Sequence, residues 1–248
     1  MDKIFCLIPI ILVATGWLYF LTRLAPEVEL EKETKLQFPG NLQELQDVAK
    51  LMSAYYSKNW YYVLVLFSSA YLYKQSFMIP GSVLLNVLGG ALFDFTIAFP
   101  LVCFLTGVGA SCCFLLAKTF GKDFIQKKFP NKITWLQQQV DQNKERLPYY
   151  LLFLRLFPMS PNWLINVLSP MAGIPLSLFA LTATIGLMPY NFVCVHSGKM
   201  LASLKSLDDL FSFSTLVQMA ILALVALGPS MLVKKTSFTQ QAKHQKVE

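Results

Sequence analysis

The sequence predicts an all-α polytopic membrane protein, built as an inverted repeat of a re-entrant helical hairpin followed by a transmembrane helix. Of its 248 residues, 55% are hydrophobic and only 14% are charged, whereas a soluble domain carries about 25% charged residues. The apolar residues also form long blocks, and about 20 apolar residues are enough to span a bilayer. Finally, one unusual pattern of residues occurs twice.

Six apolar blocks are the candidate membrane segments: Ile4–Leu24, Trp60–Ile79, Ile97–Phe120, Tyr149–Phe157, Leu176–Ser197 and Phe213–Val233. We expect the first block to be a retained anchor, residues 1–24. Its apolar run is longer than the 7–15 residues of a signal peptide, and no small-residue cleavage site follows it. A cleaved signal peptide is the alternative.

The charges of the loops predict the orientation, because lysine and arginine favour the cytosolic side. Residues 121–148 carry five Lys and one Arg against three acids, and the chain from Lys234 carries four Lys and one Glu. Residues 24–59 carry four Lys against six acids, and residues 199–212 carry two of each. We therefore expect the first two regions in the cytosol and the other two on the opposite, luminal side.

This orientation requires two re-entrant hairpins. If Trp60–Ile79 crossed the membrane fully, the span at 97–120 would carry the basic loop to the wrong side. The conflict disappears when residues 60–95 enter and leave on one face, and residues 149–173 do so on the cytosolic face. The predicted organisation is an anchor (1–24), a luminal linker (25–59), a membrane domain (60–235) and a cytosolic tail (236–248).

The repeated pattern occupies the two hairpins. The first copy is KQSFMIPGSVLLNVLG, which begins at Lys74, and the second is RLFPMSPNWLINVLS, which begins at Arg155. Each copy has a basic residue, then a methionine, then a proline, and then an apolar stretch with an asparagine in its middle, LLNVL or LINVL. A Gly-Lys pair lies twelve residues after Gly109, and another lies twelve residues after Gly186. One membrane crossing separates the two hairpins, so the second unit is inverted, as in many transporters.

The hairpin breaks are predicted at Pro80, Gly81, Pro158 and Pro161. Proline removes a backbone donor, and glycine tolerates unusual dihedral angles. The freed backbone groups must then be buried in protein or line a wet cavity.

Two cations and two asparagines at matched positions are the candidate lipid-headgroup contacts: Lys74, Arg155, Asn86 and Asn166. A cation at the bilayer centre costs roughly 2.5–3.5 kcal/mol on insertion scales, so a matched pair suggests a function. Arg155 is the stronger candidate, because a guanidinium binds phosphate through two parallel hydrogen bonds. The alternatives are snorkelling of the cations to the interface and a structural role for the asparagines.

Other chemistries lack residues to support them. No carboxylate lies between Trp60 and Phe93 or between Tyr149 and Leu207, and proton-coupled carriers commonly use one. The five cysteines form no CxxC pair and there are two histidines, so we expect no metal site and buried, inert thiols. We predict no enzyme activity, no cofactor and no nucleic-acid partner.

Two segments outside the hairpins have apolar residues near helical spacing. Asn41–Lys58 and Lys132–Leu147 are each predicted as an amphipathic helix lying against the membrane or the helical bundle. The second follows Lys127, Lys128 and Lys132, which could contact anionic cytosolic lipid.

These residues resemble the DedA family, also called the VTT-domain superfamily. FLRLFPMSPNW resembles its arginine-proline signature and IPGSVLLNVLGGALF its first hairpin, while AYLYKQSFMIPG and PYNFVCVHSG are most similar to the eukaryotic transmembrane protein 41 branch. The resemblance covers roughly residues 40–235. It implies re-entrant hairpins, an endoplasmic reticulum location, and phospholipid scrambling tied to autophagy and lipid mobilisation. Bacterial members have carboxylates where this chain has Tyr73 and Ser82, and a second arginine where it has Pro161.

Three functions stay open from the sequence. The first is passive scrambling of membrane phospholipids through a polar groove between the hairpins. The second is an ion-coupled secondary transporter of an anionic lipid or solute, and the third is a structural or trafficking factor. The lipid, the protein partners and homo-oligomer formation are not determined by these patterns.

Overall fold

The computed structural model describes residues 3–27, 36–157, 161–199, 217 and 221, and none of these lies in a β-strand. The predicted all-α class is therefore confirmed. The helices are η1 (Lys3–Cys6), α1 (Leu7–Arg23), α2 (Leu42–Lys58), α3 (Trp60–Ser76), α4 (Ser82–Leu92), α5 (Phe95–Leu116), η2 (Ala117–Gly121), α6 (Lys122–Lys128), α7 (Pro130–Gln142), η3 (Lys144–Arg146), α8 (Leu147–Leu156), α9 (Asn162–Leu168), α10 (Leu176–Gly186) and α11 (Met188–Gly198). The predicted span 213–233 and the tail 236–248 lie outside the described residues, apart from 217 and 221.

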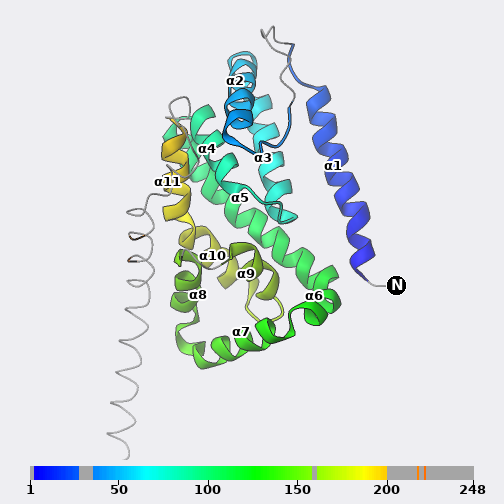
Figure 1. Cartoon of the computed structure of the whole chain (residues 1–248), viewed down its shortest axis with the longest axis vertical. Helices are drawn as coiled ribbons and strands as arrows, with labels where there is room; N and C mark the ends of the chain where they lie inside the picture. The colour runs from blue at the N-terminus through cyan, green and yellow to red at the C-terminus, as the bar shows by residue number, and fades with distance from the viewer. Residues whose placement is uncertain (1–2, 28–35, 158–160, 200–216, 218–220, 222–248) are drawn as a thin grey trace, which may run out of the picture.

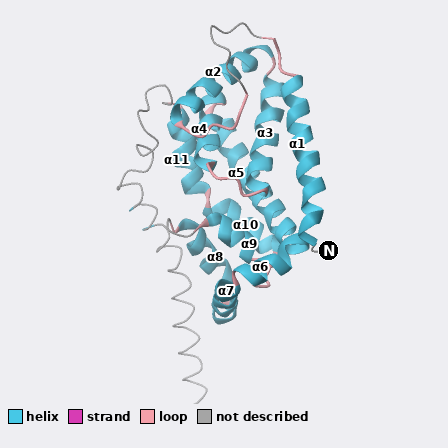
Figure 2. Ribbon diagram, turned by 45° about the vertical axis from the view of Figure 1, so that its right-hand side comes forward, coloured by secondary structure: helices cyan, strands magenta, loops and turns pink. Residues whose placement is uncertain are grey.

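Helix α5 is the central element, and the other helices form two groups around its two halves (Figure 1). One apolar core joins α2, α3, α4 and α11 to the first half of α5, and a second core joins α7, α8, α9 and α10 to its second half. The amphipathic helices α2 and α7 lie at opposite ends of the body in both views, and α1 runs alongside α3 (Figure 2).

One described helix is long and apolar enough to cross a membrane. It is formed by α5, η2 and α6 in succession, Phe95–Lys128, and η2 within it is a turn of π-helix. Helices α10 and α11 pass the same test together but meet at an angle of 42°. The sequence predicted one continuous span, Leu176–Ser197. The break has a physical cause, because Pro189 lies in the first turn of α11 and cannot continue a preceding helix.

The first predicted break has the backbone geometry that its residues allow. Gly81 has φ of 97° and Met78 has φ of 58°, so the chain between α3 and α4 passes twice through the left-handed region. Glycine adopts this conformation without a side-chain clash. The amide of Ile79 donates to the carbonyl of Lys74 at 3.0 Å, which satisfies one backbone group that the break releases.

The second break lies between α8 and α9, where Pro161 occupies the N-cap position of α9. The other predicted break residue, Pro158, lies outside the described residues. The structure thus contains both broken helix pairs. The re-entrant path of each pair through the membrane, and the inversion of one unit relative to the other, stay predictions.

The two amphipathic segments are helical, with one difference. Of the apolar residues at helical spacing in α2, Leu45, Val48, Met52 and Tyr55 are buried and Leu42 is half-buried. The Asn41 side chain accepts a hydrogen bond from the Glu44 amide as a helix cap. In the second segment, α7 ends at Gln142, so Leu147 belongs to the next helix. Asn143 caps the end of α7 and the 3₁₀ turn η3 follows it, which interrupts the predicted periodicity.

Candidate functional site

The most unusual side chain in the second helix pair is Arg155, which lies on α8 and is only 6% exposed. Its Nη1 donates to Oδ1 of Asn166 at 2.6 Å and to Oδ1 of Asn162, both on α9. The guanidinium carbon lies 4.7 Å from the ring centroid of Phe179 on α10, a cation–π contact. The cation is therefore held by neutral groups on two neighbouring helices.

The other terminal nitrogen of Arg155, Nη2, is buried and has no hydrogen-bond partner among the described residues. Buried polar groups are paired in most proteins, so an unpaired guanidinium nitrogen needs an explanation. An ion pair joins Lys144, in η3, to Asp141, near the end of α7. Arg155 thus offers a positive charge and a free donor, and no described carboxylate neutralises it.

Gly186 brings α10 close to this cation. A Cβ atom added to Gly186 would lie 2.5 Å from Cβ of Arg155 and 3.2 Å from its Cγ. The matched glycine of the first unit, Gly109, faces Gln75 on α3 in the same way, at 2.6 Å from its Cβ. In both units, a glycine on the following span lets that span pack directly against the first arm of the hairpin.

In the first helix pair, Lys74 on α3 is 4% exposed. Its ammonium lies 3.5 Å from Oγ of Ser82, which is at the long limit for a hydrogen bond. Ser82 begins α4, just as Asn162 begins α9. The two matched cations therefore both contact the first residue of the second hairpin arm, although Arg155 is held far more tightly.

The two matched asparagines have different surroundings. Asn166 accepts a hydrogen bond from Arg155 as described above. Asn86 is fully buried at 0% exposure and has no hydrogen bond to Lys74. The structure therefore joins Arg155 to Asn166 by a hydrogen bond, whereas Lys74 and Asn86 have different partners.

Asn86 belongs instead to a closed ring of four side chains. Its Nδ2 donates to Oδ1 of Asn191 at 2.9 Å, and Asn191 Nδ2 donates to Oγ1 of Thr106 at 3.2 Å. The Thr106 and Tyr71 hydroxyls lie 2.7 Å apart, and the Tyr71 hydroxyl donates back to Oδ1 of Asn86 at 2.8 Å. With Thr106 as donor to Tyr71, each residue donates one bond and accepts one, and the ring connects α3, α4, α5 and α11.

We expect this ring to stabilise the contact between α4 and α11. Asn86→Leu or Asn191→Leu leaves partners unsatisfied, which costs about 1–3 kcal/mol of unfolding free energy each. The double variant should lose less than the sum, with a coupling of about 0.5–2 kcal/mol. Equilibrium unfolding in lipid bicelles measures the cycle, and strictly additive losses would contradict the paired geometry.

Sequence reasoning did not identify several residues of the site. Asn162 and Phe179 hold Arg155, while Tyr71 and Asn191 close the ring with Asn86. Asn162 could have been found from the repeat, because it lies eighty residues after Ser82, the same separation as between Asn86 and Asn166. The pairing of Asn86 with Asn191 gives no sequence signal, because the two residues are 105 positions apart on different helices.

Together these features define a class: an all-helical integral membrane protein with two broken helix pairs, each holding a buried cation that no carboxylate of the described residues neutralises. Comparison with known proteins identifies the family. The VTT domain family matches residues 79–200, which contain both helix breaks. The chain belongs to the transmembrane protein 41 family, as its similarity to curated members over most of its length shows.

Three relatives illustrate the similarity. The chain is 35% identical over 210 residues to Transmembrane protein 41 homolog of Caenorhabditis elegans, covering 85% of each chain. It is 31% identical to human Transmembrane protein 41B over 229 residues, 92% of this chain and 79% of the relative. It is 33% identical to the Dictyostelium discoideum homolog, of which the alignment spans 63%. No solved structure matches it significantly.

Proposed function

We propose that this protein is a phospholipid scramblase, which lets membrane phospholipids pass between leaflets without an energy source. The single observation that supports this most is Arg155, a buried guanidinium whose Nη2 has no hydrogen-bond partner among the described residues of this helical membrane protein. A phosphate is the ligand that such a fork binds best, because it accepts two parallel hydrogen bonds and carries the opposite charge. Phospholipids supply phosphate groups at the membrane surface.

The second cation gives the headgroup another contact. Lys74 is buried in the first helix pair, and its contact to Ser82 is weak. A headgroup that moves through the hydrocarbon region must replace part of its hydration with protein groups. Lys74 and Arg155, with Asn162 and Asn166, supply donors in the two hairpin units, so each unit could bind the phosphate in turn.

The distribution of charge favours a passive process. The segments Trp60–Phe93 and Tyr149–Lys199 contain no carboxylate, and intramembrane carboxylates commonly carry coupling protons in pumps and transporters. Scrambling needs a polar path but no coupling site. The described residues therefore suit the passive function better than an ion-coupled transporter.

A reconstituted assay tests this proposal. Purified protein is incorporated into sealed vesicles with a trace of phospholipid that carries a fluorophore on its headgroup, and dithionite is added outside. We expect the inner-leaflet fluorescence to be lost only in vesicles that contain protein, with no ion gradient. Protein-free vesicles with intact seals are the control. Flux that needs an imposed ion gradient would indicate a transporter, and no flux would indicate a structural factor.

We further propose residence in the endoplasmic reticulum, with residues 121–148 and the chain from Lys234 in the cytosol, and a role in lipid mobilisation and autophagy. The support is the excess of Lys and Arg in these two regions and the resemblance to the transmembrane protein 41 family. New membrane is supplied to one leaflet first, so a scramblase there would balance the two leaflets.

A further inference from the structure

Helix α1 leaves a large space between itself and the rest of the protein. A cleft of about 500 Å³ lies between α1, α3 and α5 and continues to the π-helical turn η2. Its lining is almost entirely apolar and includes Ala14 and Leu18 from α1, Leu72 from α3, and Leu115 and Leu116 from α5. The volume is in the range of pockets that bind small organic ligands, about 300–1,000 Å³.

Few side-chain contacts hold α1 against this cleft. The hydroxyls of Thr15 and Tyr73 hydrogen-bond each other at 2.9 Å, and Trp17 Nε1 donates to the Ser69 hydroxyl at 3.1 Å. Both bonds join α1 to α3, and both lie among residues that border the cleft. The opposite face of α1 is open, with Val13 75% exposed. At the C-terminal end of α1, Leu21 is buried in the first core and its carbonyl accepts a hydrogen bond from the Tyr62 hydroxyl, so the cleft opens beside the part of α1 that precedes this anchor.

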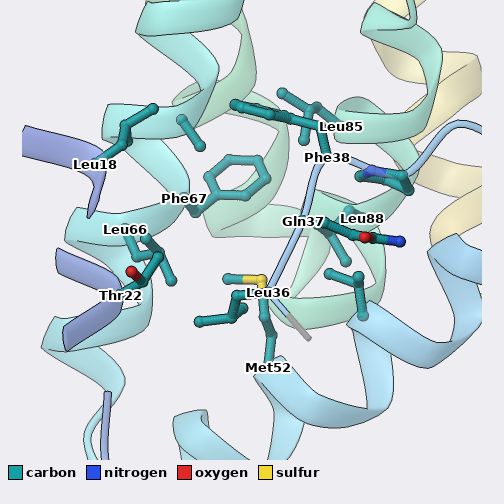
Figure 3. A pocket seen from close by; sticks show the side chains of 13 residues that line it. Leu18, Thr22, Leu36, Gln37, Phe38, Met52, Leu66, Phe67, Leu85 and Leu88 are labelled. Carbon is teal, nitrogen blue, oxygen red and sulfur yellow. The ribbon is translucent and has the colours of Figure 1, made fainter. Parts of the chain in front are cut away.

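A second, smaller cavity lies on the other flank of the same helix. Figure 3 shows it between α1, the segment 36–39 and the helices α2, α3 and α4, with Leu18, Phe67 and Met52 among its walls. It encloses about 120 Å³, and its lining is also almost wholly apolar. Leu18 borders both cavities, so apolar space extends along the inner side of α1.

We propose that the cleft between α1, α3 and α5 binds the acyl chain of a membrane phospholipid. An apolar cavity does not hold ordered water, which needs polar partners, and an empty one destabilises the protein in proportion to its volume. In a membrane-embedded protein the available apolar filler is a lipid chain. Lys118 and Lys122 are exposed beside the cleft-lining residues Thr119 and Phe120, which provides positive charge for the phosphate at that end.

This inference depends only on the membrane location of the chain and stands whether or not the protein scrambles lipid. It differs from the headgroup sites proposed above, because Lys74 and Arg155 do not line the cleft. It assigns α1 a function as one wall of a lipid site.

The test uses the full chain in vesicles that contain phosphatidylcholine with a diazirine near the methyl end of one acyl chain. After illumination, the modified peptides are identified by mass spectrometry. We expect adducts on Ile10–Leu18 and on Leu115–Phe120. Ala14→Phe places a ring in the cleft and should reduce the α5 adducts by about tenfold or more. Val13→Phe adds the same ring on the exposed face of α1 and should leave them unchanged.

Thermal unfolding shows whether Ala14→Phe folds. If it does not, Leu116→Trp is the second cleft-filling variant, because it places a larger side chain in the cleft from α5. Loss of the adducts in a folded cleft-filling variant, with retention in Val13→Phe, supports the site. Adducts confined to the exposed face of α1, or α5 adducts that neither filling variant changes, would overturn it. Scrambling measured in the same vesicles is a separate result, so failure of one proposal does not imply failure of the other.

Discussion

Replacing Arg155 with alanine is expected to slow phospholipid scrambling in vesicles by about 10- to 100-fold. A hydrogen bond to a charged group contributes about 1.5–3 kcal/mol, and each 1.36 kcal/mol of lost transition-state stabilisation lowers a rate tenfold. Within the part of the chain that the structure describes, Nη2 of Arg155 has no hydrogen-bond partner, and the side chain is held in place by Asn162, Asn166 and Phe179. The cation is thus preorganised to bind a phosphate as it passes the second hairpin.

Three further variants test whether scrambling depends on the positive charge at position 155, on the planar shape of the guanidinium, and on the position of the cation in a hairpin. Arg155→Lys keeps a positive charge but loses the planar fork, so we expect intermediate scrambling. Lys74→Ala should reduce the rate less than Arg155→Ala, since the hydrogen bond that the structure shows for the Lys74 ammonium, to Ser82, is long and weak. Arg23→Ala is the matched control, because Arg23 is an arginine at the end of α1, outside both hairpins, that donates to the Tyr19 hydroxyl, and it should scramble normally.

The folding of these variants must be measured together with the rate. Asn162 and Asn166 lose a donor when Arg155 is replaced, and a buried polar group without a partner destabilises the fold. If Arg155→Ala unfolds at the same denaturant concentration as the unmodified protein and scrambles at the same rate, Arg155 is a packing residue. Normal scrambling by such a folded variant would refute the headgroup mechanism.

The helix breaks could be predicted from the sequence because they depend on local backbone chemistry. Proline at 80 has no backbone N–H and interrupts a helix, glycine at 81 readily adopts a left-handed turn, and the structure has Gly81 at a positive φ. Lys74 and Arg155 could be singled out because each lies within an apolar block close to a break, but the sequence left snorkelling open, and the structure shows both side chains buried. The repeat placed them in matched positions, and their matched contacts to Ser82 and Asn162 agree with it.

Contacts between the two units could not be predicted in the same way. Asn86 and Asn166 occupy matched positions, yet one bonds to Asn191 and the other to Arg155. Nothing local distinguishes them, because the difference comes from which helix packs beside each one. Helix α11 crosses α4, and glycines at the crossing let the two helices come close enough for Asn86 to reach Asn191.

Gly90 and Gly198 allow α4 and α11 to approach each other so closely that their backbones touch. A Cβ atom added to Gly90 would lie 1.9 Å from the carbonyl oxygen of Val195, and one added to Gly198 would lie 2.3 Å from that of Val87. Small residues at helix crossings let membrane helices pack by van der Waals contact. A backbone atom cannot move aside as the end of a flexible side chain can.

Gly90→Ala is therefore expected to destabilise the protein by about 3 kcal/mol or more, at the upper end of the range for overpacked sites. The same step at Gly16 is the control, because an added Cβ there has no atom within 4 Å. Alanine in an open helix interior should stabilise α1 by roughly 0.5–1 kcal/mol. Unfolding of both variants in bicelles measures the difference. The ring that contains Asn86 and Asn191 bridges the same two helices, so Gly90→Ala should also abolish most of the coupling energy between these two asparagines. A Gly90→Ala protein with unchanged stability and unchanged coupling energy would contradict the close approach of α4 and α11.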